Sequence, residues 1–245
     1  MGKPVLKPSA ATSSIASALA DLRTRKPPQT DKSAAFPLPL AIHRQRDVAN
    51  TLSRRAVQHF IKADNALDWV HAFPADTSEI LRAYLPGDFI FGDALTIICQ
   101  VHGPPLRIDI STLSLSLKNV EALALLLDRG IQIHLAVAHG FRFTNLEIFQ
   151  ALLNRLTPYP YFRCAVGRIH AKSCLFQFPA GTLPITIETS ANLRSSNTIE
   201  FATVSRCPEI HRFHLEFLTE FHRIASLAQL TDFAAYSGPT DYRTP

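Results

Sequence analysis

The sequence predicts a mixed α/β fold in which a mostly parallel sheet is flanked by helices on both faces. The clearest observation is the order strand, helix, strand over residues 106–112, 117–130 and 131–138, where the helix ends at Gly130. Such a unit joins two parallel strands by a right-handed crossover. The composition agrees, because 47% hydrophobic and 18% charged residues are typical of a chain that buries a core.

Further elements follow in the same way. Residues 144–156 have the apolar periodicity of a helix, and "TPYP" breaks it. Four strand-like runs come next, and the chain then forms an amphipathic helix that begins at Pro208, a position where proline is tolerated. The four runs are YFRCAV (161–166), IHAKSCLFQF (169–178), LPITIETS (183–190) and TIEFATVS (198–205).

The chain divides into four parts. Residues 1–40, rich in Ala, Ser, Pro and Lys, predict a flexible basic arm. Residues 41–84 predict a helical segment, because apolar residues recur at helical spacing from Arg46 to Ala63. Within this segment Asp76 precedes Glu79 in a capping-box pattern. The main domain is expected at 85–230 and a frayed tail at 231–245.

Charge and cysteine content limit the functional classes. The formal net charge is +5, and residues 1–35 carry six Lys or Arg against two Asp, so the arm accounts for most of it. A solvated cationic arm favours polyanionic partners but does not establish a nucleic-acid groove. Four scattered cysteines without a C-x-x-C pair, and no signal-peptide pattern, predict a cytoplasmic protein. No apolar run is long enough to span a membrane.

The chemistry is concentrated in two stretches, "RIHAKSCLFQF" and "ETSANLRSSNTIE". On a strand His170 and Lys172 point to the same side, either into a site or into solvent at an exposed edge. The second stretch brings Ser190 and Asn192, short side chains suited to holding phosphate oxygens. Glu200 returns on the next strand as a partner for a histidine N–H.

These residues resemble the motif of the phospholipase D-like superfamily. His170-Ala171-Lys172 matches H-x-K, Thr189 to Asn192 matches G-S/T-x-N with Thr in place of Gly, and Asn197 and Glu200 match the acidic pattern that follows. The resemblance extends over residues 85–205. It departs at Gln177, where the family has Asp, a position usually treated as structural or as an orienter of the histidine.

The resemblance implies a metal-independent phosphodiesterase without a cofactor. His170 would attack phosphorus to give a phosphohistidine, and Lys172 and Asn192 would stabilise the developing charge. Glu200 would orient His170, while Ser190 and Asn197 would bind phosphate. Because a second histidine must protonate the leaving group and the chain has one motif copy, two chains are expected to share one site.

The expected substrate is DNA or RNA, and the expected assembly is a homodimeric nuclease without a membrane partner. The small, single-motif chain and the absence of a basic amphipathic surface segment favour nucleic acid over lipid. Two alternatives stay open: a phospholipid headgroup hydrolase or transferase, and a non-catalytic nucleic-acid-binding protein, which Gln177 favours.

Other constellations carry less weight. Cys207, His211 and His214 have a zinc-like spacing but no fourth ligand nearby. His139 follows one of the two parallel strands and Ser111 ends the other, so both are candidates to line the substrate cleft. Packing is the alternative for His139, and helix capping is the alternative for Ser111 and its neighbours. The sequence predicts that Trp69 and the phenylalanines form the core.

Overall fold

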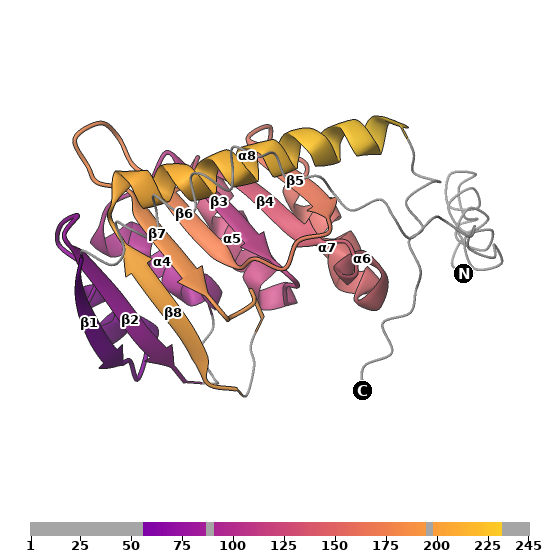
Figure 1. The fold of residues 1–245 in the computed structure, drawn as a ribbon. Coiled ribbons are helices and arrows are strands. Elements are labelled where there is room, and N and C mark those ends of the chain that lie inside the picture. Colours follow the sequence, from indigo (N-terminus) through magenta and orange to yellow (C-terminus); the bar gives the residue numbers. More distant parts are fainter. Residues whose placement is uncertain (1–55, 87–90, 195–197, 232–245) are drawn as a thin grey trace, which may run out of the picture. The chain divides into compact units, whose positions relative to one another are not determined.

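The computed structural model describes residues 56–86, 91–194 and 198–231, which form a sheet with helices on both faces (Figure 1). The strands are β1 (Val57–Lys62), β2 (Glu79–Leu85), β3 (Arg107–Thr112), β4 (Gln132–Ala138), β5 (Phe162–Gly167), β6 (Ser173–Gln177), β7 (Ile185–Thr189) and β8 (Glu200–Ser205). The helices are α3 (Ala66–His71), α4 (Phe91–Val101), α5 (Leu117–Asp128), α6 (Phe141–Thr144), α7 (Leu146–Leu156) and α8 (Pro208–Thr231). Of the predicted arm and tail, only Thr231 lies within the described residues.

The strand order is β1-β2-β8-β7-β6-β3-β4-β5. The β1/β2, β3/β4 and β4/β5 pairs are parallel, and the other four pairs among the described strands are antiparallel. The mixed α/β class is therefore confirmed, but the expected parallel majority is wrong. The reason is that β6, β7 and β8 are joined without crossover helices, and strands joined in that way run antiparallel.

The unit β3–α5–β4 has the predicted parallel register, with Ile108 opposite Ile133. Ser116 caps α5 by accepting a hydrogen bond from the Asn119 N–H, as expected for a serine just before a helix. Gly130 ends the turn after the helix with φ +80°, a conformation that favours glycine. Local sequence therefore determines both ends of this helix.

The predicted helix over residues 46–63 is wrong in its described part, because Val57–Lys62 forms the edge strand β1. Strand β2 lies beside it and pairs antiparallel with β8, from the far end of the sequence. The sheet therefore continues across the predicted boundary at residue 84. Apolar and polar residues alternate only weakly in Val57–Lys62, so the sequence pattern does not separate an edge strand from a helix.

The predicted capping box at Asp76 does not start a helix. One carboxylate oxygen of Asp76 accepts hydrogen bonds from the backbone N–H and the hydroxyl of Ser78, at 2.7 and 2.6 Å. This is a turn closed by an aspartate side chain, and the chain enters β2 directly after it. Aspartate satisfies backbone donors equally well in turns and at helix starts, so the sequence pattern did not separate the two.

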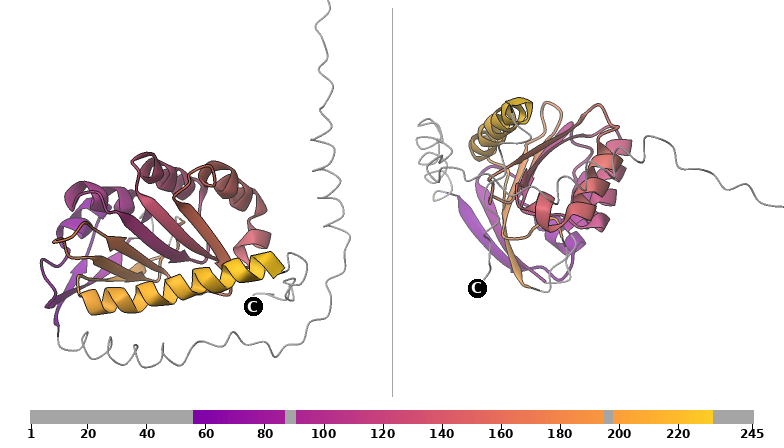
Figure 2. Two further views of the ribbon diagram at one scale, coloured as in Figure 1. Left: turned by 90° about the horizontal axis from the view of Figure 1, so that it is seen from above. Right: turned by 90° about the vertical axis from the view of Figure 1, so that its right-hand side faces the viewer.

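Helices cover the two faces of the sheet differently (Figure 2). Helices α4, α5 and α7 form a layer on one face, where Leu95, Leu123 and Leu152 are fully buried. Of the described helices, α8 alone crosses the other face, where Leu218 and Phe221 pack on alanines and Leu175 of the sheet. The prediction of helices on both faces is thus confirmed. No helix within the described residues is apolar over a length that spans a bilayer.

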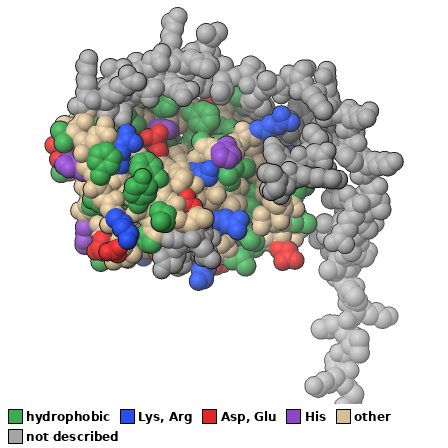
Figure 3. All heavy atoms as spheres, turned by 60° about the horizontal axis from the view of Figure 1, so that its bottom comes forward, with side chains coloured by type: hydrophobic (Ala, Val, Ile, Leu, Met, Phe, Trp, Pro, Cys, Tyr) green, Lys and Arg blue, Asp and Glu red, His purple; other side chains and the backbone are tan. Residues whose placement is uncertain are grey.

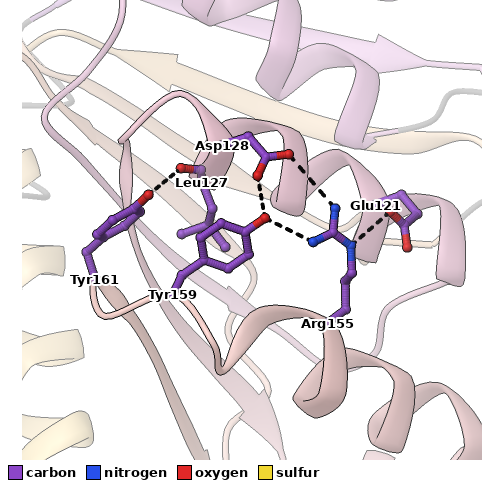
Figure 4. A network of polar contacts seen from close by, with 6 residues as sticks. All are labelled: Glu121, Leu127, Asp128, Arg155, Tyr159 and Tyr161. Carbon is purple, nitrogen blue, oxygen red and sulfur yellow. Dashed lines mark hydrogen bonds and ion pairs between the residues drawn. The ribbon is translucent and has the colours of Figure 1, made fainter.

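A polar network joins α5 to α7 and to the turn before β5 (Figure 4). Arg155 on α7 contacts Glu121 on α5 at 3.3 Å and the Tyr159 hydroxyl at 2.9 Å. Tyr159 in turn donates a hydrogen bond to Asp128, and Tyr161 donates one to the Leu127 carbonyl at 2.8 Å. The network lies in the helical layer, away from the residues of the motif.

Candidate functional site at one edge of the sheet

The motif residues meet because of the strand directions. The carboxyl ends of β1 to β5 and of β7 point to the same edge of the sheet, where β6 and β8 begin (Figure 1). Figure 3 turns this edge toward the viewer, and Lys or Arg side chains, a histidine and hydrophobic side chains gather there. The edge therefore collects polar side chains that lie far apart in the sequence.

The turn after β7 is held on three sides. The Thr189 N–H donates to the Lys172 carbonyl at 3.0 Å, which ties the turn to the start of β6. The Ser190 N–H donates to the Phe201 carbonyl at 2.9 Å, which ties it to β8. The Leu193 N–H donates to the Thr112 hydroxyl at 3.1 Å, which ties it to the end of β3. A turn with three such attachments holds its side chains in fixed positions.

Lys172, Ser190 and Glu200 form one cluster on this edge. The Ser190 hydroxyl donates to the Glu200 carboxylate at 2.5 Å and accepts from the Phe201 N–H at 2.9 Å. Partial burial lowers the pKa of the Lys172 ammonium, and the charge of nearby Glu200 opposes that shift. The Glu200 carboxylate also accepts from the Thr198 hydroxyl at 3.1 Å. Its described partners are therefore hydroxyls and the Lys172 charge, while His170 is not among them.

His170 lies beside Lys172, but not on a strand. Strand β6 begins at Ser173, so the expectation that His170 and Lys172 share one strand face is wrong. The physical reason is the pairing of β6, which starts where Ser173 meets Glu188. The Lys172 ammonium instead turns back and donates to the His170 carbonyl at 3.3 Å. Among the described residues the exposed imidazole of His170 has no hydrogen bond.

Asn192 is oriented by the backbone of Leu113, directly after β3. Its side-chain oxygen accepts a hydrogen bond from the Leu113 N–H at 3.1 Å. Because a backbone N–H only donates, the accepting atom is the amide oxygen, and the NH₂ group is left to donate elsewhere. A half-buried amide with its oxygen fixed and its donors unengaged among the described residues is suited to an anionic oxygen.

Of the remaining predicted site residues, Ser111 and His139 have partners outside this cluster. The Ser111 hydroxyl is buried and hydrogen-bonded to Ser173 at 2.8 Å. His139, after β4, packs edge-on to Phe143 with ring centroids 5.0 Å apart. The cap of α5 is Ser116 rather than Ser111 or a close neighbour. Asn197 lies outside the described residues.

Gln177, where the resemblance fails, lies at the far end of β6. It ends the strand that begins directly after Lys172, about 14 Å farther along at ~3.4 Å per residue. Its amide donates to the Asp109 carboxylate at 2.8 Å, and Asp109 also accepts from Arg107 and His134. The place of Gln177 in this group was missed because the antiparallel pairing of β3 with β6 brings it there.

The zinc-like residues Cys207, His211 and His214 contact different partners. The Cys207 thiol contacts Glu209, His211 Nδ1 lies 3.1 Å from the Thr186 hydroxyl, and His214 lies 3.1 Å from Glu188. A search of the described part of the chain finds no group of three metal-ligating side chains.

Comparisons with known proteins concern the fold. No protein-family model matches the sequence, and no curated protein matches it. Among solved structures, the chain is similar to a phospholipase D family member, Nuc from Salmonella typhimurium, with 16% identity, a TM-score of 0.44, and coverage of 59% of this chain and 93% of that one. It is also similar to the polyphosphate kinase from Porphyromonas gingivalis, with 15% identity, a TM-score of 0.45 and coverage of 78% of this chain. This chain spans 31% of that kinase.

Proposed function

We propose that this chain is a metal-independent phosphodiesterase that cleaves nucleic acid through a phosphohistidine at His170. One observation carries the proposal: the exposed imidazole of His170 has no hydrogen-bond partner among the described residues, and the Lys172 ammonium lies 3.3 Å from the carbonyl oxygen of the same residue. A structural histidine is normally hydrogen-bonded or packed, whereas a nucleophile must present a free nitrogen to its substrate. The phospholipase D-like motif that these residues resemble assigns them the same role.

The reaction proceeds in two displacements. A neutral ring nitrogen of His170 attacks phosphorus, the P–N bond forms, and the bond from phosphorus to the leaving oxygen breaks. A second histidine protonates that oxygen and afterwards takes a proton from water. Water then attacks the phosphohistidine, the P–N bond breaks, and His170 is regenerated. Charge on the non-bridging oxygens is stabilised by the Lys172 ammonium and the Asn192 amide, which replace a divalent cation.

The second histidine comes from a second copy of the chain. Of the ten histidines in the sequence, His170 alone is followed two residues later by lysine. Its exposed position at the sheet edge is compatible with the approach of the same residue from a partner. A two-fold axis through this edge places the two His170 side chains in one site, where one is the nucleophile and the other is the acid of the first displacement and the base of the second. The active species in this proposal is therefore a homodimer.

Nucleic acid is the proposed substrate class because the surroundings of the motif suit a chain of phosphates. Lys and Arg side chains are spread along the exposed edge rather than confined to one pocket (Figure 3). The position of Gln177 supports catalysis over binding alone, because the substituted residue lies far from His170 along β6. The departure from the motif therefore does not touch the reacting groups.

The test is incubation of the purified full chain with plasmid and with single-stranded DNA in EDTA, beside His170→Ala. A matched control is His71→Ala, which removes another exposed imidazole, on α3. We expect cleavage by the native chain and by His71→Ala, and none by His170→Ala. Strict dependence on a divalent ion, or unchanged cleavage by His170→Ala, contradicts the proposal. Salt-sensitive retention of DNA without cleavage assigns the binding-only alternative instead.

A further inference from the structure

Three aromatic side chains lie on neighbouring strands of one sheet face. Tyr84 on β2 is directly opposite Phe201 on β8, and their ring centroids are 5.6 Å apart. Phe60 on β1 pairs with Arg82, and Lys62 pairs with Tyr84, so these side chains share the same face. Phe60 is 71% exposed and Tyr84 is 58% exposed. We call Phe60, Lys62, Arg82, Tyr84 and Phe201 the aromatic face.

The core does not account for the aromatic face. Helix α8 crosses this side of the sheet near the edge opposite the motif and does not extend over the part nearer the motif (Figure 1). Ile80, two residues before Arg82 on the same side of β2, is buried against Cys207 and Ile210 at the start of α8. No described helix covers Tyr84, two residues beyond Arg82, which is 58% exposed. Exposed aromatic side chains grouped in this way mark a binding surface.

The aromatic face is continuous with the turn after β7. Phe201 is the residue whose N–H donates to the Ser190 hydroxyl and whose carbonyl accepts from the Ser190 N–H. Glu200, its neighbour in the chain, belongs to the Lys172 cluster. A polymer whose phosphate is bound at Lys172 and Asn192 therefore reaches the aromatic rings through its adjacent units.

We propose that the aromatic face binds the unstacked bases of a single-stranded nucleic acid. This inference rests on the proposed function and adds the substrate class. Bases stack on exposed aromatic rings whatever their sequence, and cations between the rings hold the backbone phosphates. Lys62 and Arg82 supply such cations within the face. A duplex keeps its base faces stacked inside, so it gains nothing from these rings.

A second copy of this chain is the competing occupant. Pairing of the aromatic face with itself about a two-fold axis would bring Lys62 and Arg82 of one copy against the same residues of the other. Like charges brought together in a closed interface destabilise it. A nucleic-acid strand instead supplies the opposite charge together with flat apolar rings. Charge complementarity therefore favours the nucleic acid.

The test measures the fluorescence anisotropy of a labelled oligothymidylate and of a labelled duplex in EDTA. His170→Ala serves as the background, so that the probes stay intact. Phe60→Ala and Tyr84→Ala are added singly and together; both side chains are exposed, so the fold is retained, and Tm is measured to verify this. Leu125→Ala is the matched control, because Leu125 is 56% exposed on α5, on the opposite layer. Phe201→Leu, which keeps an apolar side chain while removing the ring, is a third variant.

We expect each aromatic replacement to weaken binding of the single strand by about fivefold or more, with little change for the duplex and none for Leu125→Ala. In the active chain the same replacements raise KM for single-stranded substrate and leave kcat nearly unchanged. Unchanged single-strand binding, or equal losses for both probes, overturns the aromatic-face proposal. A fall from dimer to monomer mass in these variants, by light scattering, also overturns it and assigns the face to a second copy.

The two proposals fail in different ways. If the native chain cleaves DNA in EDTA but Phe60→Ala and Tyr84→Ala act on single strands as the native chain does, the aromatic-face proposal alone is wrong. If the native chain neither binds nor cleaves any nucleic acid, the proposed function is wrong and the aromatic-face proposal with it.

Discussion

The side-chain amide of Gln177 donates a hydrogen bond to the carboxylate of Asp109 at 2.8 Å. Asp109 is 2% exposed and also accepts from Arg107 at 2.8 Å and from His134 at 3.3 Å. Burial alone would raise the pKa of this carboxyl, but the hydrogen bond from His134 and the charge of Arg107 outweigh it and lower the pKa. At the position where the family motif has an aspartate, this chain therefore has an uncharged amide that donates to the carboxylate of Asp109 on the neighbouring strand β3.

Gln177→Asp is expected to destabilise the fold without affecting the chemistry. A second carboxylate beside Asp109 repels it, so we expect a loss of about 1–3 kcal/mol at neutral pH. The loss shrinks at mildly acidic pH, where one of the two carboxyls binds a proton. Urea unfolding of the variant and of Gln177→Ala at both pH values checks this. An equal loss of stability at both pH values would contradict repulsion between the two carboxylates. Loss of cleavage by the folded variant would contradict the separation of residue 177 from the reacting groups.

The pH dependence of stability is expected to reflect His211. Burial lowers the pKa of His211 to about 4, although Asp109 on β3 opposes the shift. Below about pH 6.5 the unfolded chain binds a proton at this histidine more readily than the folded chain does. The stabilisation that neutral His211 gives the folded state is therefore complete above about pH 6.5 and is lost as the pH falls toward 4. This loss amounts to about 3 kcal/mol. Burial also lowers the pKa of His222 to about 4, so we expect His211→Gln to reduce the slope of the unfolding free energy between pH 7 and pH 5 without removing it.

Asn192→Asp separates the two roles of this side chain. The aspartate still accepts the hydrogen bond from the Leu113 N–H, so stability is expected to change little. It offers a negative charge in place of the amide donor, so kcat/KM is expected to fall by about 10²-fold or more. Cleavage assays and thermal unfolding of the same preparation check both statements. Native-like activity of this variant would remove Asn192 from the reaction.

Gly167→Ala tests the contact between β5 and α8. A Cβ atom at Gly167, the last residue of β5, would lie 2.8 Å from the ring of Phe221. We expect a loss of about 1–3 kcal/mol because the ring must move within a packed layer. Gly140→Ala is the control, since a Cβ there meets nothing within 4 Å. If both variants unfold at the native Tm, the described packing of α8 is wrong.

The elements that the sequence predicted well carry their own end signals. Helix α5 is bounded by Ser116 and Gly130, and β3 and β4 alternate clearly on either side of it. The prediction failed where an element is defined by pairing with another strand, because a local sequence pattern does not show that pairing. Val57–Lys62 is a strand because β2 pairs with it, and β6 starts at Ser173 because β7 pairs there.

The sequence predicted which residues form the candidate site but did not predict which contacts hold them. The motif selected His170, Lys172, Asn192 and Glu200, which lie at the same sheet edge (Figure 1). The fixing of Asn192 by Leu113 and the engagement of Glu200 by Ser190 depend on how strands far apart in sequence align, which a local pattern does not contain. For the same reason Phe60 and Phe201 were expected in the core.

The account depends most directly on a covalent bond between His170 and phosphorus. Native chain mixed with excess oligonucleotide in EDTA is quenched into alkaline denaturant, where phosphohistidine persists, and digested with trypsin. Mass spectrometry is expected to find the nucleotide adduct on the peptide Ile169–Lys172, forming and decaying at rates that match turnover, and absent from His170→Ala. Turnover without that adduct, or with an adduct on a different side chain, would contradict the mechanism.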